Sequence, residues 1–287
     1  MKNFIIPLSA LVLLSCTTKS QEPSAFKELF DLSTHHTEIS GMIYQNGTGN
    51  LWMLEDKGNA PELYVYSDEG EFLRTVTIKD QHNTDWEDLS TDTKGNLYIG
   101  NFGNNKNERQ DLAILKIDES TLLENEVSPT QITKFSYEDQ TDFPPKKSEL
   151  KFDSEAFVAT AAYFYIFTKN RSKGYDGSFS VYKVPNRGGE FVAKKVATLE
   201  SCSNYKNCAI TGASISKDES KIVLLTHDKV FALDFSNDAS FQQEHLKAFE
   251  LGHHSQKEAV AFKNNSELYI ADEKDKNGGK VYYFTLD

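Results

Sequence analysis

Five polar residues recur at equivalent points of a weak internal repeat, and their side chains could bind a metal ion. Each is followed by a small residue or by Asp. Carboxylate and hydroxyl oxygens, with no His or Cys among them, suit a hard cation, and Ca²⁺ takes about 6–8 oxygen ligands. The pattern therefore predicts a ring of calcium ligands made by Ser40, Glu87, Glu155, Thr211 and Glu258.

Three glutamates that face one axis repel one another. Burying such charges without compensation costs several kcal/mol or forces protonation, and a bound cation would remove that cost. The alternative is an ordinary polar channel in which backbone amides, water and lysines satisfy the carboxylates. Trp86, beside Glu87, is expected to pack between repeats and not to touch a ligand.

The repeat itself is a set of short strands. In each unit an apolar strand, a turn and a second aliphatic or aromatic strand are followed by a third strand, with no sustained helical period. The five polar residues are 47, 68, 56 and 47 residues apart. Fourth strands are expected in the first four units at 72–78, 131–137, 190–199 and 245–251. Four-stranded units at such spacings are typical of a β-propeller.

We therefore predict an all-β fold, a five-bladed β-propeller closed by an N-terminal strand. The last unit lacks a fourth strand, and the segment 25–32 is expected to supply it, which would cover the exposed edge of that blade. Residues 138–152 and 200–208 fall outside the repeat as insertions. A sixth, degenerate blade and a pair of β-sandwiches are the alternatives.

The first residues indicate export. Lys2 precedes an apolar run at 4–14, which is too short for a membrane-spanning helix of about 20 residues and is typical of a signal peptide. The stretch Leu13-Leu14-Ser15-Cys16 resembles the lipobox of bacterial lipoproteins, in which the cysteine is lipidated. The expected division is a signal peptide at 1–15, a lipidated linker at 16–24 and the propeller at 25–287. The expected location is the bacterial cell envelope, with a lipid anchor in the membrane.

Charge and cysteine content fit that location. The formal net charge of −12 argues against nucleic acid and anionic membrane surfaces as partners and is compatible with cationic ligands. Cys202 and Cys208 stand close together, and in an oxidising compartment they are expected to form a disulfide that closes a small loop.

The loops after the second strands should surround the mouth of the channel and form a polar collar. Lys57, Lys169 and Arg171 suit the binding of a phosphate, because lysine supplies a point charge and arginine a bidentate fork. Glu55 or Asp56 could orient or deprotonate a water molecule. The further candidate ligand-binding residues in these loops are Asn101, His227 and Asp272.

The order of the five ring residues resembles that of the calcium-activated nucleotidases (apyrases). Those proteins are five-bladed propellers in which Ser, Glu, Glu, Ser and Glu face a central calcium ion, and the strings EISGM, WEDLS, SEAF and EAVAF are similar. The resemblance implies a nucleoside diphosphate at the channel mouth and metal-assisted hydrolysis. No aromatic residue here matches the nucleotide-stacking residue of that family. The EISG…LWMLED unit is also similar to gluconolactonase-type propellers, which use an inner-strand glutamate as a metal ligand.

Three functions follow as alternatives. The first is an envelope protein with a calcium-centred propeller whose channel mouth binds a small molecule or a protein. The second is a calcium-dependent phosphohydrolase of nucleotide-like substrates, and the third is a structural component of an envelope complex. Fold alone does not decide between them.

Overall fold

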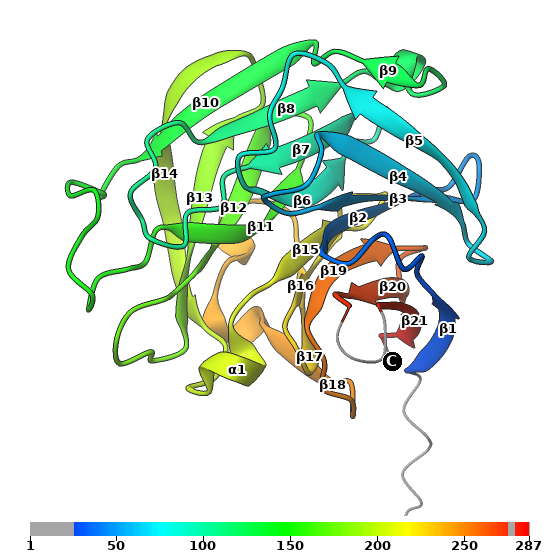
Figure 1. The fold of residues 1–287 in the computed structure, drawn as a ribbon. Coiled ribbons are helices and arrows are strands. Elements are labelled where there is room, and N and C mark those ends of the chain that lie inside the picture. Colours follow the sequence, from blue (N-terminus) through cyan, green and yellow to red (C-terminus); the bar gives the residue numbers. More distant parts are fainter. Residues whose placement is uncertain (1–25, 275–278, 287) are drawn as a thin grey trace, which may run out of the picture.

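The protein is built of β-strands that form four sheets around a common centre (Figure 1). A computed structural model describes residues 26–274 and 279–286. The signal peptide, the linker and the lipidation site Cys16 expected from the sequence lie outside these residues. Within the described chain, no helix is both long and apolar enough to cross a bilayer.

The first two sheets cover the N-terminal half of the chain and part of its middle. One sheet has the order β2 (Ile39–Gln45), β3 (Asn50–Glu55), β4 (Glu62–Ser67), β5 (Phe72–Ile78) and β9 (Glu126–Val127). The largest sheet has the order β11 (Asp153–Ala159), β12 (Tyr163–Lys169), β13 (Ser178–Pro185), β14 (Gly189–Glu200), β10 (Gln131–Tyr137), β8 (Ala113–Ile117), β7 (Leu97–Asn101) and β6 (Trp86–Thr91). It consists of two antiparallel four-strand meanders that are joined by the parallel pairing of β10 with β14.

The other two sheets have four strands each. One contains β15 (Gly212–Ile215), β16 (Lys221–Leu225), β17 (Lys229–Asp234) and β18 (Lys247–Glu250). The last contains β19 (Lys257–Phe262), β20 (Glu267–Asp272), β21 (Lys280–Thr285) and β1 (Lys27–Asp31). β1 pairs antiparallel with β21, so strands from the two ends of the sequence lie side by side (Figure 1).

The fourth strands expected from the sequence are confirmed to within about two residues at either end. Sequence analysis missed the parallel contact between β10 and β14, because local periodicity carries no information on how two outer strands meet. It also missed β9, which pairs in parallel with the end of β5 and covers part of that edge. The insertions contain no long element: α1 (Tyr205–Cys208) is one turn, and the segment 138–152 has no strand.

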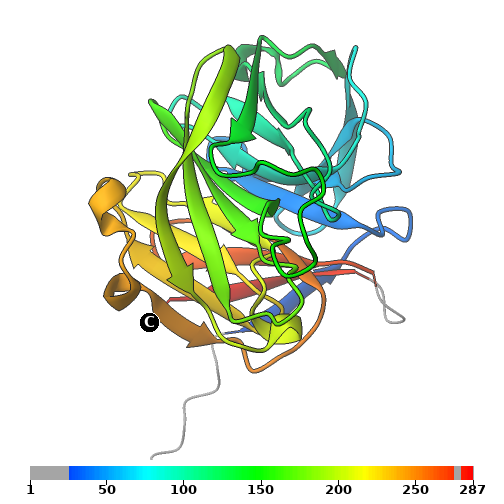
Figure 2. The same cartoon turned by 90° about the vertical axis from the view of Figure 1, so that its left-hand side faces the viewer.

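The first strand of each meander lies at the centre. β2 contacts β6, β6 contacts β11, β11 contacts β15, β15 contacts β19, and β19 contacts β2. Figures 1 and 2 show these strands gathered in the middle of the molecule, with the later strands farther out. The apolar core lies between neighbouring sheets; Trp86, for example, is fully buried in a cluster with residues of the sheet that contains β2.

No ladder of hydrogen bonds joins these central strands, and side chains tie them together instead. The carboxylate of Asp88, on β6, is fully buried and accepts hydrogen bonds from the backbone N–H groups of Leu89 (2.8 Å), Phe157 (3.1 Å) and Ala213 (3.3 Å). It thereby connects three central strands. Burial raises the pKa of Asp88, and the three N–H groups act in the opposite direction.

Replacing Asp88 with Ala should lower the free energy of unfolding by about 3 kcal/mol or more, because buried N–H groups would lose their acceptor. Urea denaturation measures this change. Asp234→Ala is the matched control, since Asp234 is an exposed strand residue, and it should change stability by less than about 0.5 kcal/mol. Equal effects of the two substitutions would contradict the role assigned to Asp88.

Candidate functional site

Four of the five predicted ring residues lie at β-bulges near the starts of central strands. The pairing registers shift between Ile39 and Gly41, Trp86 and Asp88, Ser154 and Ala156, and Lys257 and Ala259. The residue at each shift is Ser40, Glu87, Glu155 or Glu258. A bulge changes the direction of a side chain and is common beside functional sites. The fifth residue, Thr211, directly precedes β15. The repeat alignment thus identified structurally equivalent positions.

The two hydroxyl residues of the ring tie neighbouring strands together. Ser40 Oγ donates to the carbonyl of Trp86 (3.2 Å), and Thr211 Oγ1 donates to the carbonyl of Lys257 (2.6 Å). Each acceptor is the residue before a ring glutamate of the next unit. The hydroxyls therefore fix the backbone that carries Glu87 and Glu258. Because each hydroxyl donates its hydrogen to a carbonyl, its oxygen lone pairs remain able to bind a cation.

Glu155 is held by two basic residues. The Lys169 ammonium contacts Glu155 Oε2, and Arg171 Nη2 lies 2.5 Å from Glu155 Oε1. Arg171 also contacts Asp153 through Nε and donates to the Tyr205 hydroxyl (3.0 Å). Lys169 and Arg171, which the sequence suggested as phosphate ligands, are thus engaged with carboxylates. Burial raises the pKa of Glu155 to about 7, against the opposing effect of Lys169.

Glu87 is the ring glutamate without a counter-charge in direct contact. Its side chain is 7% exposed and makes no hydrogen bond or ion pair within residues 26–274 and 279–286. Burial and the neighbouring Glu155, Asp85 and Asp153 carboxylates raise its pKa well above the usual value. In this setting the protonated form of Glu87 is favoured, and a nearby cation would favour the charged form.

Glu258 and Asp85 have one basic partner each. His227 Nε2 lies 3.2 Å from Glu258 Oε1, and Lys57 Nζ lies 3.2 Å from Asp85 Oδ1. Lys57 remains half-exposed, so this pair is weakly stabilising. Burial raises the pKa of Glu258, but Lys169 and His227 outweigh it and hold that pKa below its usual value.

Three candidate collar residues are engaged in hydrogen bonds within the fold. Glu55 Oε1 accepts from the N–H groups of Thr37 (2.6 Å) and Glu38 (3.1 Å). Asn101 Oδ1 accepts from Arg109 (3.1 Å), and Asp272 accepts from the N–H of Lys280 (2.7 Å) and from the hydroxyl of Tyr282 (2.8 Å). These partners leave Glu55 and Asp272 little capacity to bind a ligand.

Asp56 differs from Glu55. One of its oxygens, Oδ1, is buried and has no hydrogen-bond partner in the part of the chain that the structure describes. Burial and nearby Glu38 raise the pKa of Asp56 to about 7, and burial with Glu258 raises that of Glu273 to about 8. The candidate site therefore contains more carboxylates than basic groups.

Sequence reasoning missed several residues that shape this cluster. Asp153 anchors Arg171 and accepts from the N–H of Asn104 (2.6 Å). A Cβ on Gly103 would stand 1.9 Å from Glu87 Oε1 and 2.5 Å from Asp85 Cγ, so glycine is needed for the loop to pass beside both carboxylates. The run GNFGNN before Arg109 was the available signal, since closely spaced glycines and asparagines often mark a tightly packed loop.

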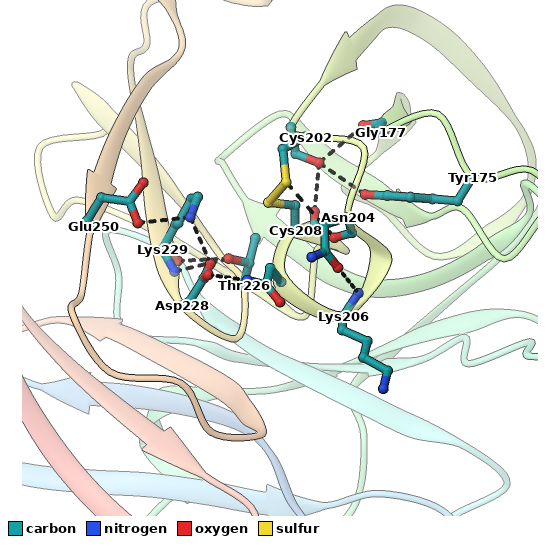
Figure 3. The surroundings of a disulfide bond; sticks show 12 residues. Tyr175, Gly177, Cys202, Asn204, Lys206, Cys208, Thr226, Asp228, Lys229 and Glu250 are labelled. Carbon is teal, nitrogen blue, oxygen red and sulfur yellow. Dashed lines mark hydrogen bonds and ion pairs between the residues drawn. A yellow bond between two sulfur atoms is a disulfide. The ribbon is translucent and has the colours of Figure 1, made fainter.

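The disulfide stands at the edge of the cluster. Cys202 and Cys208 are bonded, and Figure 3 shows how they close the turn that carries Asn204 and Lys206 beside the Asp228 hairpin. Asn207 in this turn donates to Asp228 (2.7 Å). The same turn presents Tyr205 to Arg171, so the disulfide loop contributes to positioning that arginine.

The donor set of the ring suits a calcium ion in chemistry more than in position. The ring offers carboxylate and hydroxyl oxygens, which are the donors calcium prefers. Among residues 26–274 and 279–286, Glu87 and one oxygen of Glu258 make no hydrogen bond or ion pair, and Glu155 is shared by Lys169 and Arg171. Among the described residues, no three or more Asp, Glu, His or Cys side chains are already gathered as a metal-binding group. The oxygen donors of the ring fit calcium, whereas their side chains would have to move closer together to surround one ion.

No protein-family model matches the chain, and no curated protein does. Among solved structures it is similar to the PQQ-bound aldose sugar dehydrogenase of Streptomyces coelicolor, with a TM-score of 0.50 and 9% identity over 93% of this chain and 100% of that one. It also matches a chain of a nidogen/laminin complex (TM-score 0.47, 12% identity, 91% and 92% coverage). A luciferin-regenerating enzyme gives a TM-score of 0.44, 13% identity and coverage of 91% and 95%. The first likeness supports a propeller-like all-β fold and nothing about function.

The raised pKa values of Asp56 and Glu273 predict how stability depends on pH. A carboxyl with a raised pKa in the folded state contributes stability that is complete below its unfolded pKa of about 4 and is lost as pH rises through the folded value. In EDTA, we therefore expect the melting temperature to fall between about pH 5 and pH 8.5. Asp56→Asn should flatten this fall, and Glu69→Gln, at an exposed position, should not. Parallel pH profiles for wild type and Asp56→Asn would contradict the assignment.

Proposed function

We propose that this protein is a cell-envelope lipoprotein in which a five-bladed propeller binds calcium and a further ligand at one mouth of its channel. The five meanders would be the blades, and β1 would close the ring as the fourth strand of the last one. The circular contacts among β2, β6, β11, β15 and β19 support five blades, and the β1–β21 pairing supports the closure. The N-terminal sequence supports lipidation at Cys16.

The observation that carries the proposal is Glu87, a buried residue whose carboxylate makes no hydrogen bond or ion pair within the described chain. It lies beside Glu155, Asp85 and Asp153, and burial of so much negative charge favours a cation. Glu87 and Glu258 would hold the calcium ion, with Ser40 and Thr211 supporting them and Glu155 joining if its basic partners move. Bound calcium would supply positive charge and coordination positions for a ligand with oxygen donors.

The ligand would be a small molecule or a protein segment that reaches the channel mouth. Lys57 and the disulfide loop stand near this mouth, and their polar groups are candidates for ligand contacts. The net charge of −12 supports a partner other than nucleic acid. The sequence resembles the calcium-activated nucleotidases, in which the channel mouth binds the ligand, and this supports the channel mouth as the binding face here.

Calcium should raise the melting temperature of the purified protein relative to EDTA, because an ion bound only by the native state stabilises it by about 2.7 kcal/mol at a hundredfold excess over Kd. Glu87→Gln should remove most of the calcium-dependent rise. Glu124→Gln, at an exposed position, should retain it. Identical melts in calcium and EDTA at pH 8 would overturn the calcium part of the proposal.

A catalytic role is the second candidate, and Asp56 is the residue that favours it. Its pKa of about 7 suits a general base at neutral pH, and its buried Oδ1 has no partner within the described chain. The substrate would be a phosphoester or nucleotide that reaches the calcium site. The occupation of Lys169 and Arg171 by carboxylates favours binding over catalysis as the first proposal.

If the protein is a hydrolase, it should release phosphate from nucleoside di- or triphosphates in calcium above a no-protein blank. Asp56→Asn should then lower kcat by about 100-fold, the usual contribution of a general base, while Glu69→Gln should not. Phosphate release can be followed by a colorimetric assay. Absence of release by the native protein, with calcium-dependent stabilisation intact, would reject catalysis and leave the binding function standing.

A further inference from the structure

Lys169 is a buried lysine at the end of β12, and its side chain is 8% exposed. Its ammonium group makes one hydrogen bond in the described part of the chain, to Glu155 Oε2. Glu155 and Glu258 are its two strongest attractive neighbours, and their effect on its pKa outweighs the burial that opposes it. Two of the three ring glutamates therefore stabilise the charged form of Lys169, and one of them, Glu155, is in direct contact with it.

The same position in the other meanders carries no lysine or arginine. The strand pairing places Phe167 opposite Ala156, the residue after Glu155, and Lys169 stands two residues farther along β12. In the other meanders the residues opposite the one that follows the ring residue are Leu54, Gly100, Leu225 and Ala271. Two residues farther along, the positions that correspond to Lys169 are Asp56, Phe102, His227 and Glu273. A single lysine thus enters a series of acidic, aromatic and histidine residues.

Arg171 has alternatives to Glu155, and Lys169 does not. Arg171 keeps Asp153 and the Tyr205 hydroxyl as partners even if Glu155 turns away. Lys169 would lose its one hydrogen-bond acceptor among the described residues. Movement of Glu155 toward a divalent ion is therefore opposed chiefly by Lys169, both by the broken ion pair and by repulsion between two cations.

We propose that Lys169 is the resident cation of the channel and competes with calcium for Glu155, so that it limits calcium affinity. This inference rests on the proposed calcium site and specifies how that site is regulated. Without the ion, the Lys169 ammonium compensates the charge of Glu155 and stabilises the folded state. With the ion, Glu155 exchanges one positive partner for another. This role differs from phosphate binding. If Lys169 served only to bind phosphate, its removal would not strengthen calcium binding.

The test is titration of CaCl₂ into the purified protein by calorimetry, for wild type, Lys169→Gln and the control Lys57→Gln. Lys57 is a basic residue of the same cluster, but it is half-exposed and pairs with Asp85. Removing a cation that repels calcium at close range should lower Kd at least about tenfold for Lys169→Gln. The change for Lys57→Gln should be smaller, because solvent screens the Lys57 ammonium. In EDTA, Lys169→Gln should melt below wild type.

The outcomes separate this inference from the function on which it rests. Calcium binding by wild type with equal or weaker binding by Lys169→Gln would overturn the competition and leave the calcium site standing. Binding by Lys169→Gln alone would support the competition and reject calcium as a ligand of the native protein. Absence of binding by both would reject both.

A variant that loses its buried counter-ion can fail to fold, so a double variant completes the test. Lys169→Gln combined with Glu155→Gln leaves no uncompensated charge at the pair and should fold in EDTA. It should bind calcium more weakly than Lys169→Gln, because the carboxylate released by the lysine is absent. Equal calcium affinity in the single and double variants would overturn the role of Glu155 in the exchange.

Discussion

The carboxylate of Asp88 is the interaction on which the centre of this molecule depends. Central strands of neighbouring sheets lie side by side without a hydrogen-bonded ladder, so their backbone N–H groups need other acceptors. Asp88 supplies one acceptor group to N–H donors of three strands. The tie requires close approach: a Cβ on Gly41 would stand 2.6 Å from the backbone nitrogen of Leu89. Small residues and a buried carboxylate therefore act together to close the middle of the channel.

The hydrogen bonds of Asp88 hold the central strands together at their middle, so the charged cluster lies toward one end of these strands. Ser90 and Ser214, farther along the same strands, accept from the N–H groups of Ala159 (2.9 Å) and Phe262 (3.1 Å), and so continue the tying of strands. On the other side of Asp88, bulges turn Glu87, Glu155 and Glu258 out of the regular pattern. The side chains that hold the strands together and the side chains that gather charge are neighbours in sequence, separated by a bulge.

The sequence predicted the strands and the equivalence of the ring positions because both depend on local pattern. Alternation of apolar residues predicts a strand, and a repeated pattern predicts repeated structure. The partners of the ring residues could not be predicted from the sequence, because they depend on contacts between distant segments. Glu155 meets Lys169 through a strand pair and Tyr205 meets Arg171 through the disulfide loop. For Gly103, the run GNFGNN indicated a tightly packed loop but not that this glycine makes room for Glu87.

The pairing of each glutamate shows how stability and binding oppose each other in this cluster. Glu258 has a hydrogen bond with His227 and the nearby Lys169, and Glu155 has Lys169 and Arg171, so both have partners within the protein itself. Compensation stabilises the folded chain but reduces the attraction for an added cation. Glu87 lacks such a partner in the described chain, so its carboxylate is the one least compensated by the protein. A cluster that combines both conditions would remain folded without an added cation and would still respond to one.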